Sequence, residues 1–292
     1  MASLAYDGRA LHYLVRGSGV PLLLIHGLGS SGADWAMQVR ALEGRFRLIV
    51  PDLPGCGHSL PLRGECSIAN FAAALWALLD HLGLAESNIA GFSLGGAVAL
   101  EMALQRPQCV PRLALINSLA SYEMDHWRKW LEAHVPSTLI HIFGMRLMGR
   151  MCATRVFPHR WQEALRERAV NVIGAAAAVS YLQIIAALAC WTATSRLSML
   201  KSRTVLIAAE HDYTPLAQKH ELAVALAADI IVVRGSRHGT PFDAVEATNA
   251  SLWAVFTDQP LPAPDRCACD LPQPMQALAF PGSLAEQHAL GP

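Results

Sequence analysis

The stretch Asn88-Ile89-Ala90-Gly91-Phe92-Ser93-Leu94-Gly95-Gly96 guides the interpretation of the whole chain. A short apolar run leads directly into a Gly-x-Ser-x-Gly turn, and an apolar helix pattern follows it. Small residues two positions before and after Ser93 suit a serine held in a sparsely populated backbone conformation. Such a turn lifts the serine hydroxyl above the sheet, toward the N–H groups that begin the helix. The pattern predicts that Ser93 is a nucleophile on a strand–turn–helix elbow.

The composition excludes several other classes of protein. The chain has 292 residues, of which 53% are hydrophobic and 16% are charged, so it can bury a large core. Lys and Arg together number 23 and equal Asp and Glu together, and without a basic stripe we expect no nucleic-acid partner. The seven cysteines are odd in number and scattered, which favours reduced thiols in a cytoplasmic protein.

Two segments bear on targeting and membranes. Residues 1–9 lack the basic start and apolar run of a signal peptide. Residues 169–195 carry no charge, but they contain several polar side chains and much alanine. We expect a buried or pocket-lining helical segment there rather than a membrane span.

Strand and helix patterns alternate along most of the chain, which predicts a mainly parallel sheet with helices on both faces. Residues 3–16 indicate a hairpin with Asp7-Gly8 at a type I′ turn. Helices are expected from Ser67, as N-cap, to His81, with Gly83 just beyond the end, and from Ser93 to about Gln105. The remaining strands are expected at 21–25, 47–50, 88–92, 113–116, 204–208 and 230–233.

The alternation stops between residues 121 and 200, where helical periodicity and aromatic residues occur without a good strand. An insertion of this size between two strands must lie at one end of the sheet. Residues 258–292 contain many prolines and little periodicity, which indicates a loosely ordered tail.

A serine hydroxyl needs a base, which is in turn oriented by a third group. The strand 204–208 is followed by Glu210 and Asp212, and the strand 230–233 is followed by His238. Because the carboxyl ends of parallel strands meet at one edge of a sheet, these groups should collect near Ser93. The order serine, acid, histidine is the one that the α/β-hydrolase arrangement requires.

Over residues 3–257 the chain resembles the α/β-hydrolase fold enzymes of the esterase, lipase and C–C hydrolase kind. The resemblance implies an α/β fold with a mainly parallel eight-stranded sheet, flanked by helices, and a helical cap after strand 6. The core would be residues 1–120 and 201–257, the cap 121–200, and the tail 258–292. The matching motifs are His26-Gly27-Leu28-Gly29, Pro51-Asp52-Leu53-Pro54-Gly55-Cys56-Gly57-His58-Ser59, Gly91-Phe92-Ser93-Leu94-Gly95-Gly96, Glu210-His211-Asp212 and Ser236-Arg237-His238.

Carried over by position, the resemblance implies that Ser93 is the nucleophile, Asp212 the acid and His238 the base. Glu210 is the competing acid, and the spacing within the motif favours Asp212. The backbone N–H groups of Leu28 and Leu94 would form the oxyanion hole.

Other polar residues in these motifs have structural interpretations. His26 is expected to anchor its loop by hydrogen bonds, and Asp52 and Cys56 to belong to a Pro- and Gly-rich turn. The glycines at 27 and 29 do not form a nucleotide-binding fingerprint, and no metal-ligand pattern is apparent. We therefore expect no cofactor and no metal.

The sequence predicts a serine hydrolase that cleaves a carboxylic ester of a small-to-medium, mostly apolar substrate held beneath the cap. Two alternatives stay open: a C–C bond hydrolase or lactonase with the same triad, and a weakly catalytic ligand receptor. A C–C hydrolase would need a basic group for a substrate carboxylate, for which Arg155, Arg160 and Arg168 are candidates. The expected partner is a small ester-like molecule, and a homo-oligomer stays open.

Overall fold

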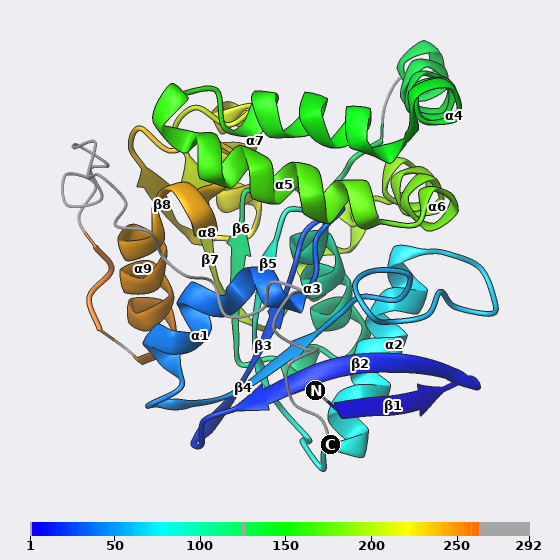
Figure 1. Cartoon of the computed structure of the whole chain (residues 1–292). Helices are drawn as coiled ribbons and strands as arrows, with labels where there is room; N and C mark the ends of the chain where they lie inside the picture. The colour runs from blue at the N-terminus through cyan, green and yellow to red at the C-terminus, as the bar shows by residue number, and fades with distance from the viewer. Residues whose placement is uncertain (1, 124–125, 258, 263–292) are drawn as a thin grey trace, which may run out of the picture.

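The computed structural model describes residues 2–123, 126–257 and 259–262, which form an eight-stranded sheet with helices on both faces (Figure 1). The strand order is β1-β2-β4-β3-β5-β6-β7-β8; the β1–β2 and β2–β4 pairs are antiparallel and the others are parallel. The predicted sheet is confirmed. Its strands are β1 (Ala2–Tyr6), β2 (Arg9–Arg16), β3 (Val20–Ile25), β4 (Phe46–Pro51), β5 (Asn88–Phe92), β6 (Arg112–Ile116), β7 (Arg203–Ala209) and β8 (Asp229–Val233).

The turn between β1 and β2 has the predicted geometry. Asp7 and Gly8 have φ angles of 47° and 66°, so both central residues are in the left-handed region that a type I′ turn requires. The hairpin continues the sheet past β4 on its antiparallel side.

Both faces of the sheet are buried, which explains why its parallel strands have continuous apolar sequences. On β3, Leu23 and Ile25 belong to the same apolar cluster as helices α2 and α3, whereas Leu22 and Leu24 belong to the cluster of α1 and α9. The helices of the core are α1 (Ala36–Leu42), α2 (Ile68–His81), α3 (Leu94–Gln105), α7 (Leu216–Ala225), α8 (Thr240–Asp243) and α9 (Val245–Thr257). The described residues also include the short 3-10 helices η1 (Gly32–Trp35), η2 (Pro107–Cys109), η3 (Arg160–Gln162) and η4 (Thr194–Met199).

The ends of α2 are those expected from the sequence. The Ser67 hydroxyl accepts a hydrogen bond from the Asn70 N–H at 3.2 Å, so Ser67 is the N-cap. Gly83 follows the last turn with a φ of 69°, the conformation that ends many helices.

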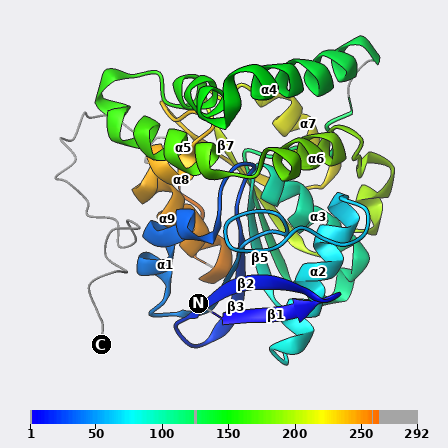
Figure 2. The ribbon, with the colours of Figure 1, turned by 45° about the vertical axis from the view of Figure 1, so that its right-hand side comes forward.

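Three helices lie between β6 and β7 in the sequence: α4 (His126–Val156), α5 (Glu163–Ala175) and α6 (Ala178–Ala189). They form a layer at one end of the sheet (Figures 1 and 2). The chain enters and leaves this layer side by side, since Ser121 and Thr192 form an antiparallel bridge. Helix α4 is interrupted at Gly144, whose φ of 74° is not helical. The interpretation of residues 121–200 as a functional cap stays a prediction.

The aromatic residues of the layer have different surroundings. Trp191 is buried and donates its indole N–H to Glu101 at 2.9 Å, and Tyr181 is buried, whereas Phe143 and Trp161 are exposed. The side chains of Trp127 and Trp130 lie outside the description.

Within the described ranges, no single helix is both long and apolar enough to cross a membrane. The pair Arg160–Ala175 and Ala178–Ala189, bent by 100°, meets the length and composition criteria together. Val172, Ile173 and Tyr181 in this pair line a cavity, so the predicted pocket-lining segment is confirmed.

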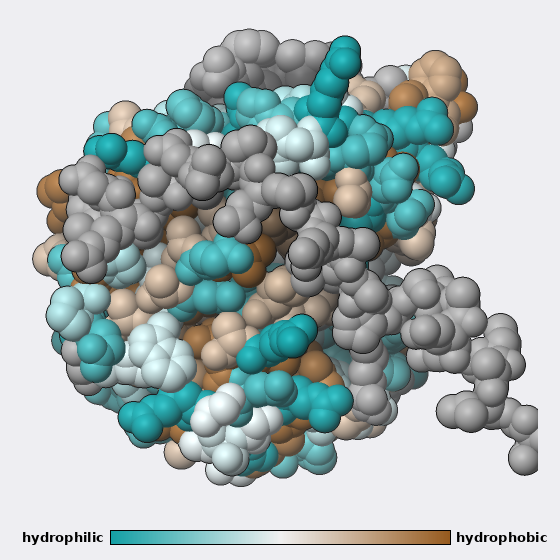
Figure 3. All heavy atoms as spheres, turned by 60° about the vertical axis from the view of Figure 1, so that its left-hand side comes forward, coloured by the Kyte–Doolittle hydropathy of each residue, from teal (hydrophilic) through white to brown (hydrophobic). Residues whose placement is uncertain are grey.

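The predicted tail at 258–292 falls almost wholly outside the described residues, as do Cys267 and Cys269. The cysteines that the structure describes, Cys56, Cys66, Cys109, Cys152 and Cys190, are free thiols. Where Figure 3 shows described residues, hydrophilic and hydrophobic side chains are interspersed on the surface.

Candidate active site

The turn after β5 is strained in the predicted way. Ser93 has a φ of 54° and a ψ of −116°, and α3 begins at the next residue. A non-glycine residue in such a conformation costs about 1–3 kcal/mol, which the surrounding packing must offset. A Cβ atom on Gly91 would lie 2.2 Å from the carbonyl oxygen of Gly95, and one on Gly95 would lie 2.2 Å from that of Ile25. The two glycines therefore allow the strand, the turn and the helix to approach one another closely.

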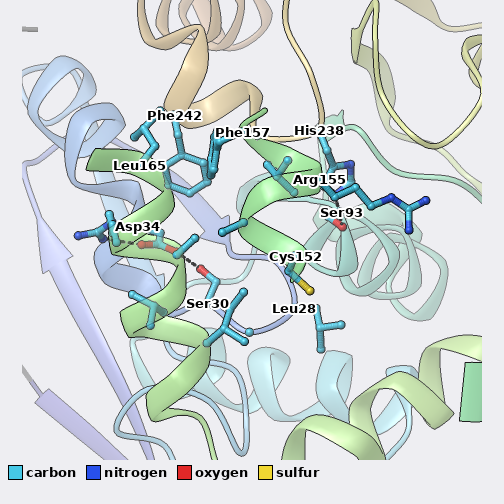
Figure 4. A pocket seen from close by; sticks show the side chains of 18 of the residues that line it. Leu28, Ser30, Asp34, Ser93, Cys152, Arg155, Phe157, Leu165, His238 and Phe242 are labelled. Atoms are coloured by element: carbon cyan, nitrogen blue, oxygen red, sulfur yellow. Dashed lines mark hydrogen bonds and ion pairs between the residues drawn. The ribbon is translucent and has the colours of Figure 1, made fainter. Parts of the chain in front are cut away.

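The structure brings together the three side chains that the sequence selected. The Nε2 atom of His238 lies 2.9 Å from the Ser93 hydroxyl oxygen (Figure 4). The Nδ1 atom of His238 lies 2.8 Å from Oδ1 of Asp212. Glu210, the competing acid, is partly exposed and accepts a hydrogen bond from the Gly235 N–H at 2.8 Å. Of the two acids, Asp212 is the one hydrogen-bonded to His238.

The Asp212 side chain is fully buried and has a second ionic partner that the sequence did not indicate. Its Oδ2 atom accepts hydrogen bonds from the Lys219 ammonium and, at 2.6 Å, from the Thr214 hydroxyl. Burial on its own would raise the pKa of Asp212, but His238 and Lys219 outweigh burial and hold the pKa well below its usual range. The carboxylate is thus ionised at neutral pH. Burial lowers the pKa of Lys219, against the attraction of Asp212.

Tyr213 is a further neighbour of the histidine that sequence reasoning missed. Its hydroxyl oxygen lies 2.9 Å from His238 Nε2, and the two ring centroids are 4.1 Å apart. Burial raises the pKa of Tyr213 above its usual value, so the phenol is neutral and can donate a proton. Two hydroxyl groups, those of Ser93 and Tyr213, thus lie at hydrogen-bonding distance from one imidazole nitrogen.

The loop after β3 lies close to the elbow. Leu28 lines the same cavity as Ser93. A Cβ atom on Gly95 would approach the carbonyl oxygens of both Ile25 and His26, so the first turn of α3 lies directly against the end of β3. This packing is compatible with oxyanion donors at Leu28 and Leu94, and their role stays a prediction.

His26 anchors this loop, as expected. Its Nδ1 atom lies 2.8 Å from the Gly27 carbonyl oxygen, and its Nε2 atom accepts a hydrogen bond from the Leu53 N–H at 2.9 Å. Burial lowers the pKa of His26, which keeps the ring neutral. Both ring nitrogens are occupied by backbone partners, so the ring ties two loops together.

Asp52 and Cys56 have the structural roles that the sequence predicted. Asp52 accepts hydrogen bonds from the N–H groups of Gly32 at 2.7 Å and His58 at 2.8 Å. Burial raises the pKa of the Cys56 thiol to about 12, which makes it unreactive.

The loop that carries His238 is held by groups that the sequence did not indicate. Asn117, in a left-handed conformation after β6, donates to the carbonyl oxygen of His238 at 2.8 Å and accepts from the Ala209 N–H at 2.7 Å. Asp243 accepts hydrogen bonds from the Ser236 hydroxyl at 2.7 Å and from the Arg237 N–H at 3.1 Å. These contacts join the ends of β6, β7 and β8.

Asp243 gives the stability of this loop a pH dependence. Burial raises the pKa of Asp243 from 3.8 to about 6, so the folded state holds the proton more tightly than the unfolded chain does. Below about pH 4, protonated Asp243 makes its full contribution to the free energy of unfolding. That contribution falls by about 3 kcal/mol as the pH rises to about 6. Urea unfolding at several pH values should show that the wild type loses more stability than Asp243→Asn between pH 4 and 6, by about this amount. Parallel curves for the two proteins would contradict the assignment.

A cavity of about 210 Å³ lies between the triad and the helical layer. Arg155 lies on the same side of it as Ser93 and His238, and Leu165 and Phe242 lie on the other side (Figure 4). Most of the lining side chains are apolar: Leu28, Phe92, Ala153, Val156, Phe157, Leu165, Ala169, Val172, Ile173 and Phe242.

One ion pair also belongs to the wall of the cavity. Arg168 of α5 donates a hydrogen bond to Asp34 Oδ1 at 2.5 Å, and the Ser30 hydroxyl donates to the other carboxylate oxygen. The pair joins the helical layer to the loop after β3, and its two charges compensate each other.

In the part of the chain that the structure describes, no group of three His, Cys, Asp or Glu side chains is arranged to hold a metal ion.

Comparisons with known proteins agree with the fold. Residues 20–144 match the family model of the alpha/beta hydrolase fold. The enol-lactonase from Burkholderia xenovorans superposes with a TM-score of 0.80 at 23% identity, over 88% of this chain and all of that chain (100%). The chain therefore has the α/β-hydrolase fold.

Two curated relatives are similar over shorter segments. A magnesium-chelatase 30 kDa subunit of Rhodobacter capsulatus is 42% identical over 110 residues, which are 37% of this chain and 37% of that protein. A putative carbamate hydrolase of Azorhizobium caulinodans is 31% identical over 158 residues, 54% of this chain and 58% of that protein. The matched segments thus span between about a third and three fifths of these relatives.

Proposed function

We propose that this protein is a serine hydrolase that cleaves carboxylic esters through an acyl-enzyme, with Ser93 as nucleophile, His238 as base and Asp212 as the orienting acid. The observation that carries the proposal is the unbroken chain of hydrogen-bonding contacts from Ser93 through His238 to a buried, ionised Asp212. Acyl transfer needs this connection because the hydroxyl must lose its proton as it attacks.

In the proposed mechanism, His238 Nε2 takes the proton of Ser93 as the hydroxyl oxygen attacks the substrate carbonyl carbon. The hydrogen bond from Nδ1–H to Asp212 holds the ring in the tautomer that leaves Nε2 free to accept, and stabilises the imidazolium that forms. The N–H groups of Leu28 and Leu94 would bind the oxyanion, a contribution of about 3–4 kcal/mol for each well-placed donor. His238 then returns the proton to the leaving group, and water releases the acyl group by the reverse path.

The cavity supports a small-to-medium substrate with an apolar part. Its walls are mostly apolar and its volume of about 210 Å³ borders directly on Ser93. We infer that residues 121–200 act as a cap whose helices α4 and α5 close the site from above. The free thiols support the expectation of a cytoplasmic protein.

Hydrolysis of a lactone or a C–C bond would use the same triad, and the relatives are named for carbamate and enol-lactone chemistry. A ligand receptor on the same scaffold would lack turnover. A panel of p-nitrophenyl esters of rising chain length separates an esterase from these alternatives, because an esterase should show an optimum at short or medium chains. A flat and negligible response would favour the lactone or C–C alternative.

The experiment that tests the nucleophile is labelling with a fluorophosphonate, which reacts with activated serines. Wild-type protein should be labelled stoichiometrically at Ser93, because His238 lies within proton-transfer distance of its hydroxyl. Ser93→Ala should not be labelled, whereas Ser118→Ala, which removes a neighbouring buried hydroxyl, should be labelled like the wild type. An unlabelled wild type, or labelling that survives Ser93→Ala, would refute the proposed function. Mass spectrometry of the intact protein provides the readout.

A further inference from the structure

The cavity contains one cation that no described carboxylate neutralises. Arg155, near the end of α4, lines the cavity with its side chain exposed. Among the side chains that the structure describes, no Asp or Glu pairs with Arg155, whereas Arg168, the other arginine of the cavity, is paired with Asp34. An arginine without a carboxylate, at the edge of a mostly apolar site, is suited to an anionic group of a ligand.

The position of Arg155 is fixed by an aromatic ring. Its guanidinium carbon lies 4.6 Å from the centroid of the Tyr213 ring. Stacking uses the flat face of the guanidinium and leaves the N–H groups at its edge free to donate, so the group is held in place without its hydrogen-bonding capacity being used.

The same tyrosine relates Arg155 to the reacting atoms. The Tyr213 hydroxyl lies 2.9 Å from His238 Nε2, so only one aromatic ring separates the guanidinium from the base. In acyl transfer the leaving-group oxygen receives its proton from this Nε2 atom. The Tyr213 hydroxyl therefore lies where that oxygen must approach, and Arg155 lies just beyond it.

From this geometry we propose that the substrate carries a carboxylate or a similar anionic group on its leaving-group side, and that Arg155 binds it. The inference rests on the proposed hydrolase function and narrows its substrate class. The apolar acyl part occupies the end of the cavity near Leu165 and Phe242, and the anion lies against Arg155 on the Tyr213 side. Arg168 and Arg160 do not bind the anion, because Arg168 forms an ion pair with Asp34 and Arg160 does not line the cavity.

The test uses two esters that differ in charge and hardly in shape, 3-butyryloxybenzoate and 3-butyryloxybenzamide. Wild-type kcat/KM should favour the carboxylate by roughly 10- to 100-fold, the effect of one charge-assisted hydrogen bond. Arg155→Gln should remove this preference, because kcat/KM for the carboxylate ester falls to about that for the benzamide ester. Arg160→Gln is the matched control, since it removes an exposed charge from the same layer, and it should keep the preference.

A binding measurement separates the two proposals. In Ser93→Ala, 3-hydroxybenzoate should bind more tightly than 3-hydroxybenzamide by a similar factor, and Arg155→Gln should abolish the difference. Hydrolysis without a preference for charge, or a preference that survives Arg155→Gln, would overturn the assignment of Arg155 and leave the hydrolase function intact. A charge preference in binding with no hydrolysis of either ester would overturn the hydrolase function and retain the anion site. Monophenyl glutarate and phenyl butyrate differ by a carboxylate on the acyl side. If the enzyme preferred charge only in this pair, the anion site would not lie beside the leaving group.

Discussion

Replacing Asp212 with asparagine should lower kcat on an ester substrate by about ten-thousand-fold. The Asp212 carboxylate accepts the Nδ1–H of His238 at 2.8 Å. An asparagine amide can donate to Nδ1 instead, which places the ring proton on Nε2, where the base needs its lone pair. KM should change little, because Asp212 is fully buried behind the ring and does not line the cavity.

Glu210→Gln is the matched control for this prediction. Glu210 uses one carboxylate oxygen to accept from the Gly235 N–H, and the carbonyl oxygen of glutamine can accept the same bond. Its kcat should stay within about threefold of wild type. A large loss in Glu210→Gln together with an active Asp212→Asn would show that Glu210 is the acid.

Lys219 complicates the single substitution, since Asp212→Asn leaves a buried ammonium without its carboxylate. A loss of activity could then reflect misfolding. The double variant Asp212→Asn, Lys219→Met removes both charges, and replacement of a buried pair by an apolar side chain is often tolerated. It should fold with a circular dichroism spectrum like that of the wild type and be as inactive as the single variant. A double variant that folds and regains activity would contradict the proposed role of Asp212.

The site residues predicted from sequence share one property: the local sequence pattern places each of them directly after a strand. Ser93 lies between two glycines at a strand end, and Asp212 and His238 each follow a strand whose apolar run is easily recognised. Because parallel strands end at the same edge of a sheet, the sequence alone predicts that these three residues lie close together. The same logic placed His26 and the Asp52 turn correctly.

Sequence pattern did not reveal the groups around the triad. Lys219 is in a helix with mixed polar and apolar residues, where a lysine ordinarily faces water; only the packing of α7 shows that it is buried against Asp212. Tyr213 and Asn117 lie in irregular turns, where no periodicity determines the direction of a side chain. Arg155 was one of three candidate arginines, and the ion pair of Arg168 with Asp34 distinguishes it.

The second large effect concerns Gly95, at the start of α3. Helix propensity alone predicts that Gly95→Ala stabilises the protein by up to about 1 kcal/mol, because Gly95 is inside a helix and its φ is not positive. Steric contact predicts the opposite. The added Cβ would lie 2.2 Å from the Ile25 carbonyl oxygen and 2.6 Å from that of His26, so β3 and α3 would have to separate. The atoms in contact belong to the backbone, which cannot move aside as a flexible side chain can. We therefore expect Gly95→Ala to lower the free energy of unfolding by about 4 kcal/mol.

The sign of the change in melting temperature shows whether helix propensity or steric contact dominates at Gly95. Thermal unfolding should show Gly95→Ala melting about 8 to 16 °C below wild type, and any folded fraction should have lost most of its ester hydrolysis, since the end of β3 leads into the Leu28 loop. Gly44→Ala is the control, because a Cβ atom there meets nothing within 4 Å, and its melting temperature should stay within about 2 °C of wild type. If Gly95→Ala melted at or above the wild-type temperature, the close approach of α3 to β3 would be wrong. The support for Leu28 and Leu94 as paired oxyanion donors would then be lost as well, because that pairing depends on the same contact.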